Sequence, residues 1–292
     1  TGLFYGGRVG KDSALPRAYG AVDEAQAILG LVRAEAGKGT ELDDILVHIC
    51  RDLWVLMAEL ATLPENRSKL VDGKTRVTSE MVEKLEHMID SLDERFVTIL
   101  QQMGVTEEIQ FLPPALWRAR TAPTEHDPWR GRLLVGDVHD ENAWALGGVA
   151  GHAGLFGTAG AVGACARHLL QVLDGRTGAF RSSTAWSFVR RRVEVPASSR
   201  ALGWDTMRPT SSCGTHMSAH AFGHVGFTGT SLWLDPATKT FVIFLSNRVH
   251  PDGKGDATPI RARIATIAGS SLTDVPPSSM ADSEKPWPRR WV

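Results

Sequence analysis

The first thirteen residues carry the clearest chemical pattern in the chain, because glycines alternate there with basic side chains. Glycine lets backbone amides turn toward an anion, and Arg8 and Lys11 add positive charge. This composition suits a polyphosphate, although the same composition is common in a flexible terminus. A P-loop is excluded, because Tyr5 and Asp12 stand where that motif needs a Gly and a Ser or Thr.

A second group of chemically capable residues lies in the Gly-rich last third of the chain. His216, His220 and His224 recur every four residues, a spacing that would align metal ligands on a helix. The flanking glycines, and the lack of a Glu after His216, instead favour strands and loops with the histidines at a surface or cleft. The run His139-Asp140-Glu141 also suggests acid–base chemistry, but hydrogen bonding within a turn is the commoner role for such residues.

Three amphipathic helices must position the glycine-rich opening. Apolar residues recur every three or four positions over 17–36, 42–60 and 79–92, and Thr78 is a suitable N-cap for the third helix. The links between these helices are short and polar, which predicts antiparallel neighbours in a bundle. Three helices cannot close such a bundle, so we expect an apolar face to stay uncovered.

The pattern changes at a seam between residues 93 and 124, where Pro113 and Pro114 exclude helix. After the seam we expect loops, a short helix over 161–173, and strands over 201–204, 221–227, 231–235 and 240–245. The turn at 236–239 predicts an antiparallel hairpin between the last two strands. Prolines and the lack of apolar periodicity predict a disordered tail over 270–292.

The bulk composition narrows the class of protein. Hydrophobic residues make up 42% of the 292 residues and charged residues 22%, as in soluble globular proteins. The formal net charge of −1 gives no reason to expect nucleic acid or an anionic membrane as partner. The three cysteines are few and far apart, which favours a reducing compartment, and we expect a cytoplasmic protein.

Three motifs of the first piece resemble the ATP:cob(I)alamin adenosyltransferases of the helical-bundle class. They are Thr1-Gly2-Leu3-Phe4-Tyr5-Gly6-Gly7-Arg8-Val9-Gly10-Lys11, Ala18-Tyr19-Gly20-Ala21-Val22-Asp23-Glu24 and Arg76-Val77-Thr78-Ser79-Glu80-Met81-Val82. The resemblance implies a trimer of helical bundles that binds ATP through the opening loop, with Mg²⁺ helping to hold the triphosphate. The Co(I) of cobalamin would attack C5′ of ATP and expel triphosphate, a leaving group that needs preplaced cations and backbone donors.

The same resemblance assigns roles to individual residues of the first piece. It implies that Lys11 and Thr1 contact the phosphates, that Arg8 and Gly6 shape the loop, and that Asp23 supports it. The family's later helices, with an Arg-Arg-Ala-Glu-Arg type of motif, do not follow in this chain. We therefore expect an incomplete transferase site.

Several motifs of the second piece resemble the C-terminal half of the serine β-lactamase and penicillin-binding-protein-like hydrolases. They are Ala122-Pro123-Thr124-Glu125, Val138-His139-Asp140-Glu141-Asn142-Ala143, Gly151-His152-Ala153-Gly154-Leu155-Phe156, Gly203-Trp204, Gly223-His224-Val225-Gly226-Phe227-Thr228-Gly229 and Leu245-Ser246-Asn247-Arg248. The resemblance implies helices packed on an antiparallel sheet and hydrolysis of an ester or amide through an acyl-enzyme. His224, Val225 and Gly226 would take the place of the family's Lys-Thr-Gly, and the N–H near Phe227 would be an oxyanion donor. We take His224, Gly226 and Phe227 as the candidate catalytic cleft.

The nucleophile of that mechanism is missing from the sequence. It requires a Ser with Lys three residues later, and no Ser in the chain meets this spacing. The nearest approach, Ser283-Glu284-Lys285, differs by one position, and the only tyrosines, Tyr5 and Tyr19, lie in the first piece. We therefore expect an incomplete hydrolase site as well.

The sequence predicts a multi-domain chain, in which an all-α helical-bundle fragment with antiparallel helices precedes an α+β, β-lactamase-like partial domain with an antiparallel sheet. We place the helical fragment at 1–96, the seam at 97–111, the β-lactamase-like segment at 112–269 and the tail at 270–292. Three hypotheses follow: a corrinoid adenosyltransferase that uses ATP, a β-lactamase-like hydrolase, or a non-catalytic fusion of two truncated proteins. The expected partners are small-molecule substrates and, by resemblance, further copies of the chain.

Overall fold

The computed structural model describes residues 1–192, 196–208 and 210–272. Contacts within the chain divide it into two compact units, Thr1–Arg95 and a second unit that begins at Phe96. Among the described residues, no helix combines the length and the apolar character that crossing a bilayer requires.

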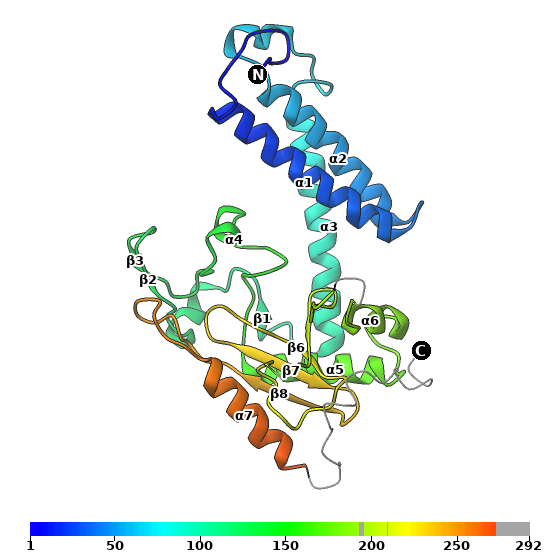
Figure 1. Cartoon of the computed structure of the whole chain (residues 1–292), viewed down its shortest axis with the longest axis vertical. Helices are drawn as coiled ribbons and strands as arrows, with labels where there is room; N and C mark the ends of the chain where they lie inside the picture. The colour runs from blue at the N-terminus through cyan, green and yellow to red at the C-terminus, as the bar shows by residue number, and fades with distance from the viewer. Residues whose placement is uncertain (193–195, 209, 273–292) are drawn as a thin grey trace. The chain divides into compact units, whose positions relative to one another are not determined.

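The first unit is helical, as predicted. Helix α1 spans Ala14–Ala36, α2 spans Glu41–Leu60, and a short 3-10 helix, η1, spans Pro64–Lys69. Helices α1 and α2 pack side by side in antiparallel directions, as their four-residue link requires (Figure 1). The Thr40 hydroxyl caps α2 by accepting the N–H of Asp43, which fixes where the second helix begins.

Helix α3 spans Ser79–Met103 and therefore extends beyond the predicted end at residue 92. The prediction was wrong because Phe96 and Leu100 continue the helical spacing of apolar residues. Both side chains pack in a small core with Val105 and Ile109. The helix ends where Gly104 takes a φ of 70°, a conformation that glycine adopts without strain.

Large apolar side chains stay exposed on the helices of the first unit. Leu31 on α1 is 71% exposed, Trp54 on α2 is 66% exposed, and Ile89 on α3 is 56% exposed. These values confirm the expectation that a three-helix fragment leaves an apolar face uncovered.

The second unit is built on a four-stranded antiparallel sheet in the order β5-β6-β7-β8. The strands are β5 (Asp205–Thr206), β6 (Phe222–Val225), β7 (Ser231–Asp235) and β8 (Thr240–Phe244). Helices α5 (Ala159–Leu173) and α6 (Ser182–Val189) pack on one face, and α7 (Thr258–Ser270) packs on the other (Figure 1). Neighbouring side chains of β7 lie on opposite faces of the sheet. Leu234 packs in the core under α5 and α6, and Trp233 packs with Met217 on the other face.

Shorter elements form the loops that precede this sheet. They are β1 (Ile109–Gln110), paired with β4 (Phe156–Gly157), β2 (His126–Asp127), paired with β3 (Arg132–Leu133), the 3-10 helix η2 (Ala115–Arg120) and α4 (Glu141–Ala145).

The sequence predicted the hairpin of β7 and β8 correctly, since the two strands are antiparallel and joined at the expected turn. The predicted strand over 201–204 was wrong, because Gly203 has a φ of 78° and the strand begins only at Asp205. The predicted disordered tail was wrong at Ser270, which ends α7. Residues 273–292 of that tail lie outside the described residues.

Candidate functional site

The glycine-rich opening is a folded hairpin. The Thr1 amino group donates to the Val9 carbonyl at 2.6 Å, and the Val9 N–H donates back to Thr1 at 3.0 Å. Gly2 and Arg8 form an antiparallel bridge, and the Leu3 N–H closes the turn on the Gly7 carbonyl at 3.1 Å. The loop therefore has a defined backbone, which a flexible terminus lacks.

The tip of the hairpin consists of three successive residues with positive φ. Tyr5, Gly6 and Gly7 have φ values of 59°, 98° and 94°. The hairpin is fastened to the helices, because the Phe4 N–H donates to the Ala61 carbonyl at 2.9 Å, immediately after α2. Gly6 thus occupies the turn position expected of a loop-shaping residue.

Among the residues that the structure describes, the cationic side chains of this hairpin have no protein partner. Arg8 and Lys11 are exposed, and within the described residues neither one forms an ion pair or a side-chain hydrogen bond. Two uncommitted cations on a fixed glycine-rich backbone are the arrangement that a triphosphate requires.

Asp23 lies on the exposed surface of α1 and has no hydrogen bond or ion pair with the hairpin in the described part of the chain. Its predicted supporting role stays a prediction. The described residues also contain no group of three His, Cys, Asp or Glu side chains that could hold a metal ion.

In the second unit, Gly226 forms a tight turn at the end of β6. Its N–H donates to the Thr230 carbonyl at 2.8 Å, and its own carbonyl accepts from Gly229 at 3.1 Å and from Arg261 Nη2 at 2.6 Å. A Cβ at this position would lie 2.2 Å from Thr230 Oγ1, so a side chain here would displace the turn. Burial, followed by repulsion from Arg248, lowers the pKa of Arg261.

Phe227, the next residue, has an N–H that shares a peptide plane with the Gly226 carbonyl, which Gly229 and Arg261 hold by hydrogen bonds. Its carbonyl accepts from Arg248 Nε at 2.5 Å, and the same guanidinium lies 4.2 Å from the centroid of its exposed ring. Among the described residues, no acceptor takes the Phe227 N–H. A fixed amide with a free N–H is the feature expected of an oxyanion donor.

His224 lies on β6, and its side chain contacts an arginine. Arg200 Nη1 is 2.9 Å from His224 Nε2. A guanidinium can only donate, so Nε2 must accept and the ring carries its proton on Nδ1. His224 therefore acts as an acceptor toward Arg200, and its predicted place in a catalytic cleft stays a prediction.

A histidine–carboxylate pair lies beside Phe227. His139 Nε2 is 2.6 Å from Glu125 Oε2, and the His139 ring stacks on the Phe227 ring with a centroid distance of 5.6 Å and an interplanar angle of 28°. Sequence reasoning considered His139 only together with Asp140 and Glu141. It missed Glu125 as the partner, because the two residues are separated by a β-hairpin and no local spacing links them.

Asp140 has a structural role. Its carboxylate caps α4 by accepting the Ala143 N–H at 2.8 Å, and it lies 3.0 Å from His152 Nε2. The hydrogen bond from Ala143, followed by that from His152, lowers the Asp140 pKa.

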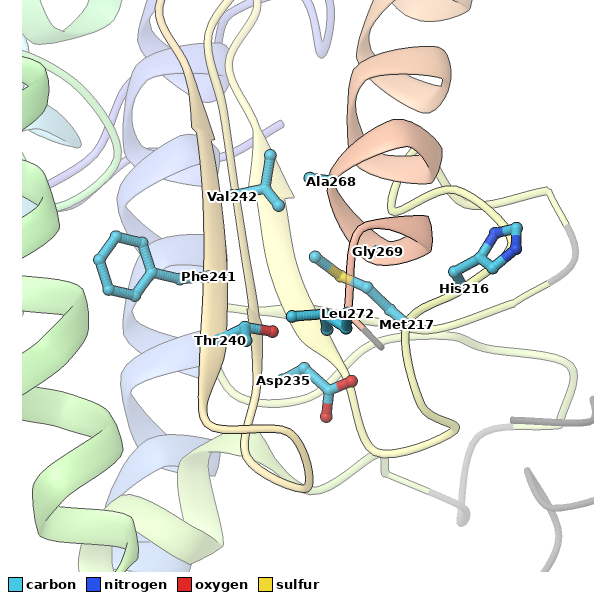
Figure 2. A pocket seen from close by; sticks show the side chains of 9 residues that line it. All are labelled: His216, Met217, Asp235, Thr240, Phe241, Val242, Ala268, Gly269 and Leu272. Atoms are coloured by element: carbon cyan, nitrogen blue, oxygen red, sulfur yellow. The ribbon is translucent and has the colours of Figure 1, made fainter. Parts of the chain in front are cut away.

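A small cavity of about 160 Å³ lies between β8 and α7 (Figure 2). Most of its lining is apolar, including Met217, Val242 and Leu272. Its carboxylate, Asp235, already accepts two hydrogen bonds from Ser218, both at 2.7 Å. His224, Gly226 and Phe227 do not line this cavity, and the His216 ring points away from it, with Nδ1 lying 3.0 Å from Thr215 Oγ1 (Figure 2).

The second unit has helices on both faces of an antiparallel sheet, which is the architecture expected of a β-lactamase-like domain. Residues 77–266 match the β-lactamase family model, which is more than half of the chain, so the chain belongs to the β-lactamase family. Residues 1–109 match the cobalamin adenosyltransferase family model. Both resemblances drawn from the sequence motifs are confirmed, and so is the multi-domain fold class.

The chain is also similar to proteins provisionally named D-alanyl-D-alanine carboxypeptidase from Salmonella agona and Salmonella typhi. Each is 36% identical over 132 residues, which cover 41% of this chain and 29% of the relative. The chain thus spans less than a third of the length of these curated relatives. A crystal structure of a β-lactamase from Mycobacterium bovis has a TM-score of 0.32 and 19% identity, and the match covers 39% of this chain and 43% of that one.

Proposed function

We propose that the first unit binds ATP through its opening hairpin and takes part in transferring the 5′-deoxyadenosyl group of ATP to cob(I)alamin. The observation that carries this proposal is the pair of uncommitted cations, Arg8 and Lys11, on a hydrogen-bonded glycine-rich loop. An exposed cation without an internal partner is free to pair with a phosphate. The match to the cobalamin adenosyltransferase family supplies the reaction class.

In this reaction the electron pair of Co(I) forms a bond to C5′ of ATP. The C5′–O bond breaks, and triphosphate leaves with that electron pair. The residues of this chain would act on the leaving group: Lys11, Thr1 and the Arg8 side chain by contacting phosphate oxygens, and the backbone of Gly6 and Arg8 by shaping the loop. Bound Mg²⁺ would neutralise part of the triphosphate charge.

The oligomeric state and the cellular location of the protein are part of the same proposal. The exposed apolar side chains of α1, α2 and α3 support association of several copies, and the family resemblance favours a trimer. The Co(I) state and the three free cysteines favour a cytoplasmic, reducing location. Because the later motifs of the adenosyltransferase family are absent from the sequence, we expect ATP binding to be better preserved than group transfer.

Two assays test the first function. ATP binding is measured by equilibrium titration of the whole chain, and adenosyl transfer is followed by the absorbance change of reduced cobalamin. We expect Arg8→Ala and Lys11→Ala to weaken ATP binding, whereas Lys74→Ala, which removes an exposed cation elsewhere in the unit, leaves it unchanged. Equal ATP affinity in all three variants would contradict the proposal.

A second candidate function belongs to the second unit, which we propose binds an acyl carbonyl of an ester or amide. The Phe227 N–H is the observation that favours it, because the Gly226 carbonyl of the same peptide group is held by hydrogen bonds and the N–H has no acceptor in the described residues. His224 and Gly226 would line the same cleft. The family's acyl-enzyme route is not open to this sequence, since no Ser has Lys three residues later.

Turnover of nitrocefin or of a p-nitrophenyl ester by the whole chain tests this second function. Gly226→Ala should reduce it, because the new Cβ would lie 2.2 Å from Thr230 Oγ1 and displace the Phe227 amide. The double variant Gly226→Ala/Thr230→Ala removes that clash and should recover activity. Absence of both ester turnover and adenosyl transfer in a folded chain would favour a non-catalytic fusion.

A further inference from the structure

We infer that Glu125 and His139 form a base that activates water for ester hydrolysis beside the Phe227 amide. This inference rests on the second candidate function, and it supplies a route that needs no serine nucleophile. It follows from the placement of a histidine–carboxylate pair against the residue that offers a free N–H.

The geometry of the pair is that of an oriented base. His139 Nε2 lies 2.6 Å from Glu125 Oε2, and the two side chains are 17% and 19% exposed. A carboxylate that accepts from one ring nitrogen fixes the tautomer and leaves the other nitrogen as the basic site. In the described residues, His139 Nδ1 has no hydrogen-bond partner of its own.

The stacking of His139 on Phe227 brings the base next to the proposed oxyanion donor. The ring centroids are 5.6 Å apart and the rings are inclined by 28°. The Gly226 carbonyl shares a peptide plane with the Phe227 N–H and accepts from the Gly229 N–H and from Arg261, so the Phe227 N–H keeps a defined direction. A carbonyl group bound at this amide would therefore lie within the same small region as a water molecule held by His139.

Two further segments hold the pair in place. Arg130 donates to the carbonyls of Val138 and His139 at 2.7 and 2.6 Å, and it also pairs with Asp127. Gly253, with a φ of 77°, lets its loop close over Glu125, because a Cβ there would lie 2.9 Å from Glu125 Oε1. The base is therefore positioned before any ligand arrives, as catalysis by proton transfer requires.

The proposed hydrolysis needs no reactant other than the ester and water. The water oxygen forms a bond to the carbonyl carbon while its proton moves to His139 Nδ1, and the Phe227 N–H stabilises the negative oxygen. The bond from carbon to the leaving alkoxide then breaks, and the alkoxide takes the proton from His139. The products are a carboxylic acid and an alcohol.

The first test measures the reactivity of the His139 ring and does not require ester turnover. Wild type and Glu125→Gln are treated with diethylpyrocarbonate, and carbethoxylation of each histidine is followed by peptide mass spectrometry. We expect modification of His139 to slow several-fold in Glu125→Gln. His152 is the internal control, because it pairs with Asp140 in an exposed position and should react at an unchanged rate. An unreactive His139, or one indifferent to Glu125→Gln, would overturn the inference.

The second test measures p-nitrophenyl ester turnover against pH. His139→Gln should lower kcat by about 100-fold, the lower end of what general-base catalysis supplies, and His152→Gln should leave kcat unchanged. A wild type that hydrolyses esters as well as His139→Gln does would overturn the role of His139 and leave the candidate function intact. A wild type without turnover would refute the candidate function and the water-activating role together.

Discussion

Both units carry basic side chains beside glycine-rich turns, but these side chains differ in what they bind. In the opening hairpin, Arg8 and Lys11 have no partner among the described residues. At the end of β6, Arg261 donates to the Gly226 carbonyl and Arg248 donates to the Phe227 carbonyl. A cation that already has internal acceptors stabilises the fold, whereas a cation without them is available for an external anion.

The two kinds of cation should contribute unequally to the free energy of unfolding. A buried charge has lost its hydration and depends on its partner, so removing that partner is strongly destabilising. An exposed charge keeps its hydration, so removing it changes the stability of the fold very little. Substitutions of engaged arginines should therefore lower stability, and substitutions of free cations should lower ligand affinity alone.

The largest effect is expected for Arg130→Met. The Arg130 side chain is 7% exposed, and its partner Asp127 is 6% exposed, so the variant leaves a buried carboxylate unpaired. Burial raises the Asp127 pKa, but the hydrogen bonds and charge of Arg130, with the Trp129 N–H, outweigh burial and lower it. We expect a loss of about 3–5 kcal/mol in the free energy of unfolding, measured by urea titration of tryptophan fluorescence.

Arg132→Met is the matched control for that measurement. Arg132 pairs with Asp137 at 2.5 Å, but its side chain is 40% exposed, so solvent screens the pair. We expect the free energy of unfolding to change far less than in Arg130→Met. Equal losses of unfolding free energy in the two variants would contradict the expectation that buried, paired arginines stabilise the fold more than exposed ones.

An intermediate effect is expected in ATP affinity rather than in stability. Arg8→Ala and Lys11→Ala should each weaken ATP binding by roughly tenfold, as expected for one charge-assisted hydrogen bond to phosphate. Their free energies of unfolding should stay within about 0.5 kcal/mol of wild type, because neither side chain has a partner in the described part of the chain. Arg33→Ala sharpens the contrast within the same unit, since Arg33 is bound to Asp43 at 2.5 Å and should not affect ATP binding.

The smallest effect is a dependence of stability on pH that comes from Asp43. The Gly39 N–H, followed by Arg33, lowers the pKa of Asp43 in the folded chain. A lowered pKa contributes stability above the unfolded value of about 4, and that contribution disappears as the pH falls through the folded value. Wild type should therefore be more stable than Asp43→Asn at neutral pH, and the difference should shrink below about pH 4. A difference independent of pH would show that the Asp43 charge contributes nothing.

The elements that the sequence predicted well are those with a local signal. The helical spacing of Leu42, Ile45 and Ile49 identified α2, and the turn at Pro236 identified the hairpin of β7 and β8. Helix α7 was missed, because Arg261 is buried among its apolar residues and interrupts the expected pattern. The arginine is buried there to reach the Gly226 carbonyl, a contact across 35 residues that no local pattern encodes.

The two candidate sites also differ in whether a local sequence signal could predict them. Arg8 and Lys11 lie within one short glycine-rich segment, so composition alone indicated an anion site. The second site needs Glu125, His139 and Phe227, which come together only through loop packing and the end of β6. Tertiary contacts of this kind determine where its base and its donor lie.

Hydrogen exchange of the whole chain with and without ATP tests the central comparison most directly. We expect saturating ATP to slow exchange of the backbone amides between Gly2 and Lys11 and to leave the segment around Phe227 and Arg248 unchanged. Slower exchange only in the segment around Phe227 and Arg248, or no slowing between Gly2 and Lys11, would contradict the proposal that Arg8 and Lys11 bind the triphosphate.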